Sequence, residues 1–168
     1  RHLRSTAAHN TVQIDGAELL EAWSSFRSGR RGRARVLARG ANDRFEDIAG
    51  LIAKAGETGA VLLYLSNPDN PMGTWWSAAD IRRMIDGLPD GCLLLLDEAY
   101  CDYAPEGIVP PIDTSIGNVL RLRTFSKAYG MAGARVGYCI GEETLISEFE
   151  KVRDHYGMNR TAEIGAMA

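Results

Sequence analysis

The stretch Cys92-Leu-Leu-Leu-Leu-Asp97-Glu-Ala-Tyr100 decides the fold class. Its four consecutive leucines show neither helical spacing nor polar–apolar alternation, so they predict a strand that is buried on both faces. Strands of this kind belong to parallel sheets that are covered by helices. In such open sheets, ligands gather at the carboxyl ends of the strands, which is where Asp97 and Tyr100 stand. The stretch therefore predicts an α/β protein with a binding site after this strand.

The segments on either side alternate between helix and strand. Apolar residues spaced three and four apart predict helices over residues 45–52, 78–88 and 145–156. Short apolar runs bounded by turn residues predict further strands over residues 60–65, 118–123 and 136–140. Because strands alternate with helices, we expect a mostly parallel sheet with helices on both faces. The last eight residues are typical of an unfinished helix, so we expect the chain to be a fragment.

The composition suits a soluble globular domain. Of the 168 residues, 45% are hydrophobic and 24% are charged, which excludes a disordered chain. No apolar run approaches the about 20 residues that cross a membrane, and the net charge of −3 gives no general reason to expect nucleic acid. Cys92, Cys101 and Cys139 match neither a disulfide framework nor a zinc site, so we expect reduced thiols, no metal and a cytoplasmic protein.

The first 40 residues differ from the rest in charge and in pattern. They hold eight arginines, no lysine and three acidic residues, a net charge of +5, whereas residues 41–168 carry −8. Alternation of polar and apolar residues predicts strands at 11–14 and 33–37. We therefore expect a β-rich segment over residues 1–40 and a separate α/β part after it. The arginines between residues 27 and 39 indicate either a solvated loop or a surface for a polyanion.

Two motifs in this first segment carry a separate resemblance. They are Ser5-Thr-Ala-Ala-His-Asn-Thr-Val12 and Trp23-x-x-Phe26-Arg27, within residues 5–35. Both resemble the C-terminal β-sandwich region of heparinase II/III-type polysaccharide lyases, in which the histidine that matches His9 lies near a metal site. His9 alone cannot build a metal site, so a polar histidine in a strand is the other interpretation. The resemblance implies a chimera, produced by gene fusion or by an artefact of assembly.

Two polar motifs follow two of the predicted buried strands. The stretch Ser66-Asn-Pro-Asp-Asn70-Pro-Met-Gly73 is a turn whose prolines fix φ, which can hold the Asn70 amide in one direction. Asp97 ends the leucine strand, and a carboxylate placed on a dry strand needs a cationic partner. The alternative for Asp97 is the N-cap of a following helix. Both motifs lie where the sheet is expected to bind a ligand.

A third motif, Thr124-Phe-Ser-Lys127, directly follows the strand predicted over 118–123. Two hydroxyls and an ammonium in so short a stretch suit anion binding and carbonyl chemistry. The chain has only three lysines, and Lys127 lies among apolar residues that would favour its uncharged, nucleophilic form. A surface lysine in a loop is the alternative. Farther on, Gly130 and Gly133 allow close backbone approach, and Arg135, expected to begin a strand, carries a fork that suits phosphate.

In this order the motifs resemble one family. The stretches Asn67–Gly73, Asp97–Tyr100 and Thr124–Tyr138 are similar to the matching segments of class I/II aminotransferases of fold type I, which depend on pyridoxal phosphate (PLP). Among these, the histidinol-phosphate aminotransferases resemble the chain most. The resemblance covers about residues 42–168, and it implies part of the large domain of a PLP-dependent transferase.

The resemblance implies roles for residues around the pyridine ring of PLP. Lys127 would form the Schiff base with the cofactor and later move a proton as general acid and base. Asp97 would pair with the pyridine nitrogen, which keeps the ring protonated and electron-withdrawing. Asn70 and Tyr100 would hydrogen-bond the phenolic oxygen. The catalytic set implied by the resemblance is therefore Lys127, Asp97 and Tyr100.

The same resemblance implies a phosphate site. Thr124, Ser126 and Arg135 would bind the phosphate of the cofactor. Met72 departs from the family pattern, which has a threonine there, and we expect the change to be tolerated. The family's Gly-rich turn, its ring-stacking aromatic residue and its carboxylate-binding arginine have no counterpart in these motifs, so the motifs do not specify the substrate.

Three interpretations of function are open at this point. The first is transamination between an amino acid and a 2-oxo acid. The second is a PLP-dependent decarboxylation on the same fold, and the third is a truncated or chimeric chain without activity. The resemblance also implies a cytoplasmic homodimer that acts on small molecules, without nucleic acid or membrane partners.

Overall fold

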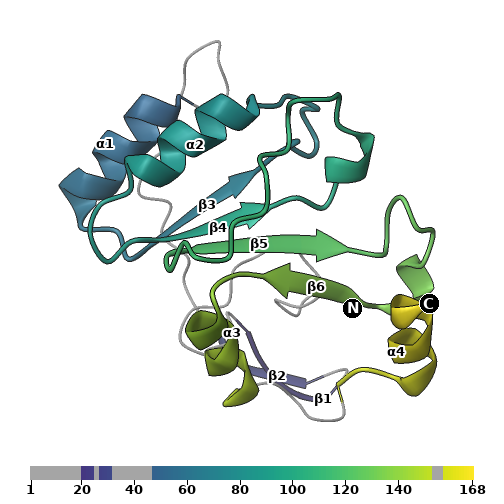
Figure 1. Cartoon of the computed structure of the whole chain (residues 1–168). Helices are drawn as coiled ribbons and strands as arrows, with labels where there is room; N and C mark the ends of the chain where they lie inside the picture. Colours follow the sequence, from purple (N-terminus) through teal and green to yellow (C-terminus); the bar gives the residue numbers. More distant parts are fainter. Residues whose placement is uncertain (1–19, 25–26, 32–46, 153–156) are drawn as a thin grey trace. The chain divides into compact units, whose positions relative to one another are not determined.

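The computed structural model describes residues 20–24, 27–31, 47–152 and 157–168 (Figure 1). Contacts within the chain divide it into two compact units, Arg1–Arg39 and Gly40–Ala168. The first unit contains a pair of short strands, and the second contains the sheet and all the described helices. Each unit is described by itself.

The described part of the first unit is an antiparallel pair of strands. Strand β1 covers Leu20–Ser24 and strand β2 covers Arg27–Arg31. Their register pairs Leu20 with Arg31 and Ser24 with Arg27, with irregularities between the paired positions. Part of the arginine-rich stretch is therefore a strand, and its interpretation as a loop is wrong for residues 27–31, where pairing with β1 satisfies the backbone. The strands expected at 11–14 and 33–37, and His9, lie outside the described residues.

The second unit is built on a four-stranded sheet. Its strands are β3 (Leu62–Ser66), β4 (Leu93–Asp97), β5 (Val119–Thr124) and β6 (Gly137–Ile140), in that spatial order. The β3–β4 and β4–β5 pairs are parallel, and β5–β6 is antiparallel. The expected mostly parallel sheet is confirmed. The β5–β6 pair is antiparallel because the chain between them, residues 125–136, turns back at the same edge of the sheet and forms no α-helical crossover.

Four α-helices accompany this sheet in the described residues. They are α1 (Ile48–Thr58), α2 (Ala78–Asp86), α3 (Glu143–Glu150) and α4 (Arg160–Met167). The first helix begins later and runs longer than its apolar spacing predicts, because Asp47 caps its start and Gly59, at φ +61°, ends it. The third ends at Glu150 instead of continuing to 156. Among the described helices, none has the length and apolar content to cross a membrane.

The main core lies between the first two helices and one face of the sheet. Figure 1 shows α1 and α2 side by side over β3 and β4. Alternate strand residues point toward these helices, as the period of a strand requires. The fully or almost fully buried members of this core are Ile48, Ala55, Leu63, Leu65, Ile81, Met84, Cys92, Leu94, Leu96 and Val119. Because this burial anchors β3 and β4, the residues that follow both strands start from fixed points.

The opposite face of the sheet is approached by α3. Leu120 points away from the main core, since its neighbour Val119 belongs to that core. A Cβ added at Gly141 would lie 2.7 Å from the side chain of Leu120 and 3.6 Å from that of Ile146 on α3. Gly141 therefore leaves the space in which the helix comes close to the sheet. Helices on both faces agree with the fold expected from the sequence.

Candidate active site

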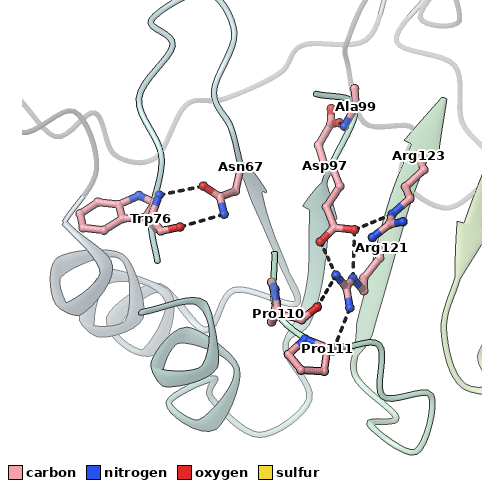
Figure 2. A network of polar contacts seen from close by, with 9 residues as sticks. Asn67, Trp76, Asp97, Ala99, Pro110, Pro111, Arg121 and Arg123 are labelled. Carbon is pink, nitrogen blue, oxygen red and sulfur yellow. Dashed lines mark hydrogen bonds and ion pairs between the residues drawn. The ribbon is translucent and has the colours of Figure 1, made fainter. Parts of the chain in front are cut away.

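The loop after β3 is closed at its base by the buried side chain of Asn67. Its amide nitrogen donates to the carbonyl of Trp76 at 3.2 Å, and its amide oxygen accepts from the N–H of Trp76 at 2.8 Å (Figure 2). Within the loop, the N–H of Asp69 donates to the carbonyl of Thr74 at 2.8 Å. These bonds hold the loop and leave Asn70 exposed at its tip. The sequence analysis singled out Asn70 and missed its support, Asn67.

Three loops meet at the ring of Tyr100. The Asn70 amide nitrogen, from the loop after β3, donates to the Tyr100 hydroxyl at 2.9 Å. The Lys127 ammonium, from the loop after β5, lies 4.9 Å from the centre of the Tyr100 ring. Tyr100 itself follows β4. The structure thus brings together three of the predicted site residues from three neighbouring strand ends, as expected for a parallel sheet.

Lys127 is exposed, so the apolar enclosure expected around its amine is not present among the described residues. The aromatic neighbours pack against one another instead. The ring of Phe125 lies 5.1 Å from that of Tyr129 and 5.3 Å from that of Tyr138, centre to centre. These separations are typical of stabilising aromatic pairs. The expected desolvation was wrong because apolar residues near Lys127 in sequence turn toward each other.

Asp97 accepts hydrogen bonds from two neutral donors. The Tyr64 hydroxyl donates to one carboxylate oxygen at 2.6 Å, and the N–H of Ala99 donates to the other at 2.9 Å. Burial, together with the bond to Asp97 and its charge, raises the pKa of Tyr64, so its hydroxyl stays a donor. The short helical turn that follows, η3 (Cys101–Tyr103), is capped at Tyr100 and not at Asp97. Asp97 therefore forms a local turn, and the helix-cap alternative is wrong.

The end of β5 and the loop that follows it contain the residues predicted to bind phosphate. Thr124 Oγ1 accepts from the N–H of Ser126 at 3.0 Å, which folds the start of the loop onto itself. Arg135 follows the short turn η4 (Ala132–Ala134) and precedes β6, so it does not begin a strand as expected. Its guanidinium donates to the Ala132 carbonyl at 2.8 Å.

The backbone of Arg135 has a φ of +54°, in the left-handed region that few residues other than glycine adopt. Such conformations cost about 1–3 kcal/mol and are concentrated at functional sites. The guanidinium is exposed. The backbone thus holds a strained arginine at the surface, close in sequence to Lys127, which supports a binding role.

A cleft of about 330 Å³ lies beside Asn70 and Tyr100. Its walls are the loop over residues 68–75 and the segment 100–105, with Trp75 and Tyr103 among the lining residues. The site therefore has room for a small molecule next to the Asn70–Tyr100 pair. No three histidine, cysteine, aspartate or glutamate residues gather as metal ligands in the described part of the chain.

A match to a family model covers residues 22–167 and is described as aminotransferase class I and II. The chain belongs to this aminotransferase family. An aromatic amino acid aminotransferase from Nocardia farcinica is 35% identical over an alignment of 162 residues that covers 90% of this chain and 45% of the relative. The chain thus spans less than half of the length of this relative. The match begins at residue 22, and the comparisons give no support to the polysaccharide-lyase resemblance of residues 5–35.

Two solved structures are similar to this aminotransferase chain. The histidinol-phosphate aminotransferase from Sinorhizobium meliloti, in complex with pyridoxal-5'-phosphate, is 48% identical with a TM-score of 0.67, over 73% of this chain and 34% of that one. The L-threonine-O-3-phosphate decarboxylase from Porphyromonas gingivalis is 26% identical with a TM-score of 0.55, over 60% of this chain and 31% of that one. Both likenesses support the α/β assignment.

Proposed function

We propose that this chain carries the PLP-holding part of an aminotransferase, and that the whole protein transfers an amino group between an amino acid and a 2-oxo acid. The observation that carries the proposal is the meeting of Asn70, Tyr100 and Lys127 at 2.9 Å and 4.9 Å. Family membership and the likeness to a PLP-bound histidinol-phosphate aminotransferase support it.

The residues present fit the chemistry of PLP. An aldehyde needs an amine that it can reach, and Lys127 is exposed and thus accessible. A phenolate needs donors, and Asn70 and Tyr100 bring an amide and a hydroxyl to one point. A protonated pyridine nitrogen needs a carboxylate, and Asp97 accepts only from neutral donors among its described contacts, so its negative charge is not cancelled there. Each polar part of the cofactor has a matching group.

When bound, PLP supplies an electron-withdrawing ring that accepts the negative charge left on the substrate carbon. Lys127 would hold the cofactor through its Nζ. Once released, its amine would take the proton from the substrate carbon and donate it to the carbon of the cofactor. Asp97 would keep the ring nitrogen protonated. Asn70 and Tyr100 would orient the ring through its phenolic oxygen.

The phosphate of PLP would be held by the loop after β5. The hydroxyls of Thr124 and Ser126 and the fork of Arg135 are donors of the type that phosphate oxygens accept. Because this loop also carries Lys127, binding of the phosphate would place the reactive aldehyde close to the amine. Once the phosphate is bound, the reaction between the Lys127 amine and the aldehyde would become effectively intramolecular.

A direct experiment separates the proposed transamination from decarboxylation. The whole protein is incubated with PLP, a panel of amino donors that includes histidinol phosphate and aromatic amino acids, and 2-oxoglutarate. Formation of the matching 2-oxo product with glutamate, without carbon dioxide, supports the proposal. Release of carbon dioxide without amino transfer would favour the second candidate, which the likeness to a threonine-phosphate decarboxylase supports.

The third interpretation, a chain without activity, has its own test. A PLP titration of the 168-residue chain, followed by visible absorbance, shows whether these residues bind the cofactor by themselves. We also propose, from the family resemblance, that the whole protein is a cytoplasmic homodimer, which light scattering and cell fractionation test. A separate origin of residues 1–40 stays a proposal, although the family match already begins at residue 22. Sequencing across residues 30–45 would test it.

A further inference from the structure

A buried ionic cluster lies directly behind the proposed cofactor residues. Glu98, which is 2% exposed, accepts two hydrogen bonds from Arg121, at 2.6 Å and 3.0 Å, and one from Arg123 at 2.9 Å. Arg121 also donates to the carbonyls of Pro110 and Pro111, at 2.9 Å and 3.0 Å (Figure 2). None of these residues belongs to the site derived above.

The cluster joins the ends of two neighbouring strands. Asp97 is the last residue of β4, and its pairing with Leu122 is the last registered pair between β4 and β5. One further bond, from the N–H of Glu98 to the Leu122 carbonyl at 2.8 Å, extends the ladder. Beyond that point, the ion pair between Glu98 and Arg123 continues the connection through side chains.

Each partner of this ion pair is next in sequence to a proposed cofactor residue. Glu98 follows Asp97, and Arg123 precedes Thr124. Since successive strand residues point to opposite faces, the ion pair lies on one side of the sheet edge and Asp97 and Thr124 lie on the other. A shift of Arg123 relative to Glu98 would therefore change the spacing between Asp97 and Thr124.

Stability alone explains such a cluster poorly. Buried ion pairs lose so much solvation that apolar residues in their place are often equally stabilising. Here one carboxylate is bonded to two guanidinium groups, which leaves an excess positive charge. Burial alone would lower the pKa of Arg123, but hydrogen bonding and charge attraction from Glu98 outweigh this and raise it, so Arg123 stays charged. What the cluster provides is a fixed position of the end of β4 relative to the end of β5.

We propose that the Glu98–Arg123 ion pair is a positioning device that sets the distance between the ring-binding end of the site, at Asp97, and its phosphate-binding end, at Thr124. The inference rests on the proposed function. It assigns to Glu98 and Arg123 a role in how the two ends of a phosphorylated pyridine are held together, without contact to the ligand.

Arg123→Gln tests the proposal, because Arg121 keeps its two bonds to Glu98 and the carboxylate stays paired in this variant. The probes are pyridoxamine 5'-phosphate and pyridoxamine, neither of which bonds covalently to a lysine. Dissociation constants of both are measured with the folded whole protein, without PLP. The readout is their ratio, which states how much the phosphate adds to binding.

We expect Arg123→Gln to reduce this ratio at least tenfold, since the phosphate no longer reaches its donors while the ring keeps its own contacts. Arg123→Lys, which keeps the charge and loses the fork, should reduce it less and replaces Arg123→Gln if that variant does not fold. Arg82→Gln is the matched control, because Arg82 makes a 3.0 Å ion pair with Asp86 on the exposed face of α2.

A merely structural cluster gives a different result. The melting temperature would fall in the Arg123 variants, while the ratio of the two dissociation constants would stay within twofold of wild type, which overturns the inference. A wild-type protein that binds neither probe contradicts the proposed function itself, so the two failures are distinguishable.

Discussion

Asp97 and Glu98 are neighbours in sequence at the end of β4, on opposite sides of the sheet. Their carboxylates have opposite kinds of hydrogen-bond partner. On one side, Asp97 accepts from the Tyr64 hydroxyl and the Ala99 N–H, both neutral. On the other side, Glu98 is fully buried and paired with two arginines. The same functional group is left with its charge in one place and neutralised in the other.

The difference in partners assigns a chemical role to Asp97 and a structural role to Glu98. Hydrogen bonds from neutral donors fix a carboxylate in direction without cancelling its charge, so Asp97 can still attract a cationic ring nitrogen. Arginine partners cancel the charge of Glu98 and tie its backbone to β5. The comparison predicts that changes on the Asp97 side alter chemistry first, whereas changes on the Glu98 side alter stability and spacing first.

The largest expected effect is that of Asp97→Asn. The neutral amide cannot keep the pyridine nitrogen protonated, so the rate of amino transfer by the whole protein should fall by about a thousandfold or more, which is about 4 kcal/mol of barrier. The fold should persist, because the amide oxygen still accepts from the Ala99 N–H and the amide nitrogen can donate to the Tyr64 hydroxyl. Single-turnover kinetics with a good amino donor measure the rate, and Asp97→Glu should be impaired less. A rate within threefold of wild type would remove Asp97 from the proposed chemistry.

Glu98→Gln should show the opposite balance. Loss of the carboxylate leaves the buried guanidinium of Arg121 and the partly buried guanidinium of Arg123 without their counter-charge. Breaking a buried pair costs about 3–5 kcal/mol. We expect the melting temperature to fall by several degrees or more. The fraction that remains folded should still bind PLP, but with lower affinity than the wild type. Thermal unfolding followed by circular dichroism measures the loss. Unchanged stability would show that Glu98 is not the framework carboxylate.

Tyr64→Phe should have a smaller effect on the chemical side. The substitution removes one of the two donors that orient Asp97 and leaves the other, Ala99, in place. Because Tyr64 is 37% exposed, we expect the affinity for PLP to fall only about threefold to tenfold. Equilibrium titration followed by absorbance measures it, with Arg82→Gln on the exposed face of α2 as the control. Equal behaviour of both variants would mean that the Tyr64 bond does not orient Asp97.

The smallest expected effect is on pH dependence. The pKa of Tyr64 is raised in the folded chain, while in the unfolded chain it is about 10. Above about pH 10 the unfolded state binds fewer protons than the folded state, so the free energy of unfolding should decrease as the pH rises. Tyr64→Phe should remove part of that decrease. Urea unfolding at several alkaline pH values compares the slopes, and parallel slopes for both proteins would refute the assignment.

The strands and the site loops were predictable because buried parallel strands form continuous apolar runs. The run at residues 92–97 predicted β4 almost to the residue, and the polar motifs after three such runs were expected at the same sheet edge. The meeting of Asn70, Tyr100 and Lys127 follows from that topology and is confirmed. The carboxyl ends of neighbouring parallel strands lie next to one another, and this does not depend on how the side chains pack.

The supporting contacts were not predictable in the same way. Tyr64 and Asp97 are 33 residues apart, and only the register of β3 and β4 brings them together. Glu98 and Arg123 are of residue types that usually lie at the surface. Their burial depends on which face of the sheet each side chain occupies at the end of its strand. The surroundings of Lys127 were predicted wrongly because nearness in sequence does not determine how aromatic rings pack.

The central claim is that the three loops meet around PLP held by Lys127. Borohydride reduction of the whole protein loaded with PLP, followed by peptide mapping, tests it most directly, because the chain has only three lysines. The other two form ion pairs, Lys54 with Glu57 at 2.8 Å on α1 and Lys151 with Glu148 at 2.5 Å at the end of α3. The account predicts that the label lies on the peptide containing Lys127 and disappears in Lys127→Ala. Label on Lys54 or Lys151 within this chain, unchanged by Lys127→Ala, would contradict it.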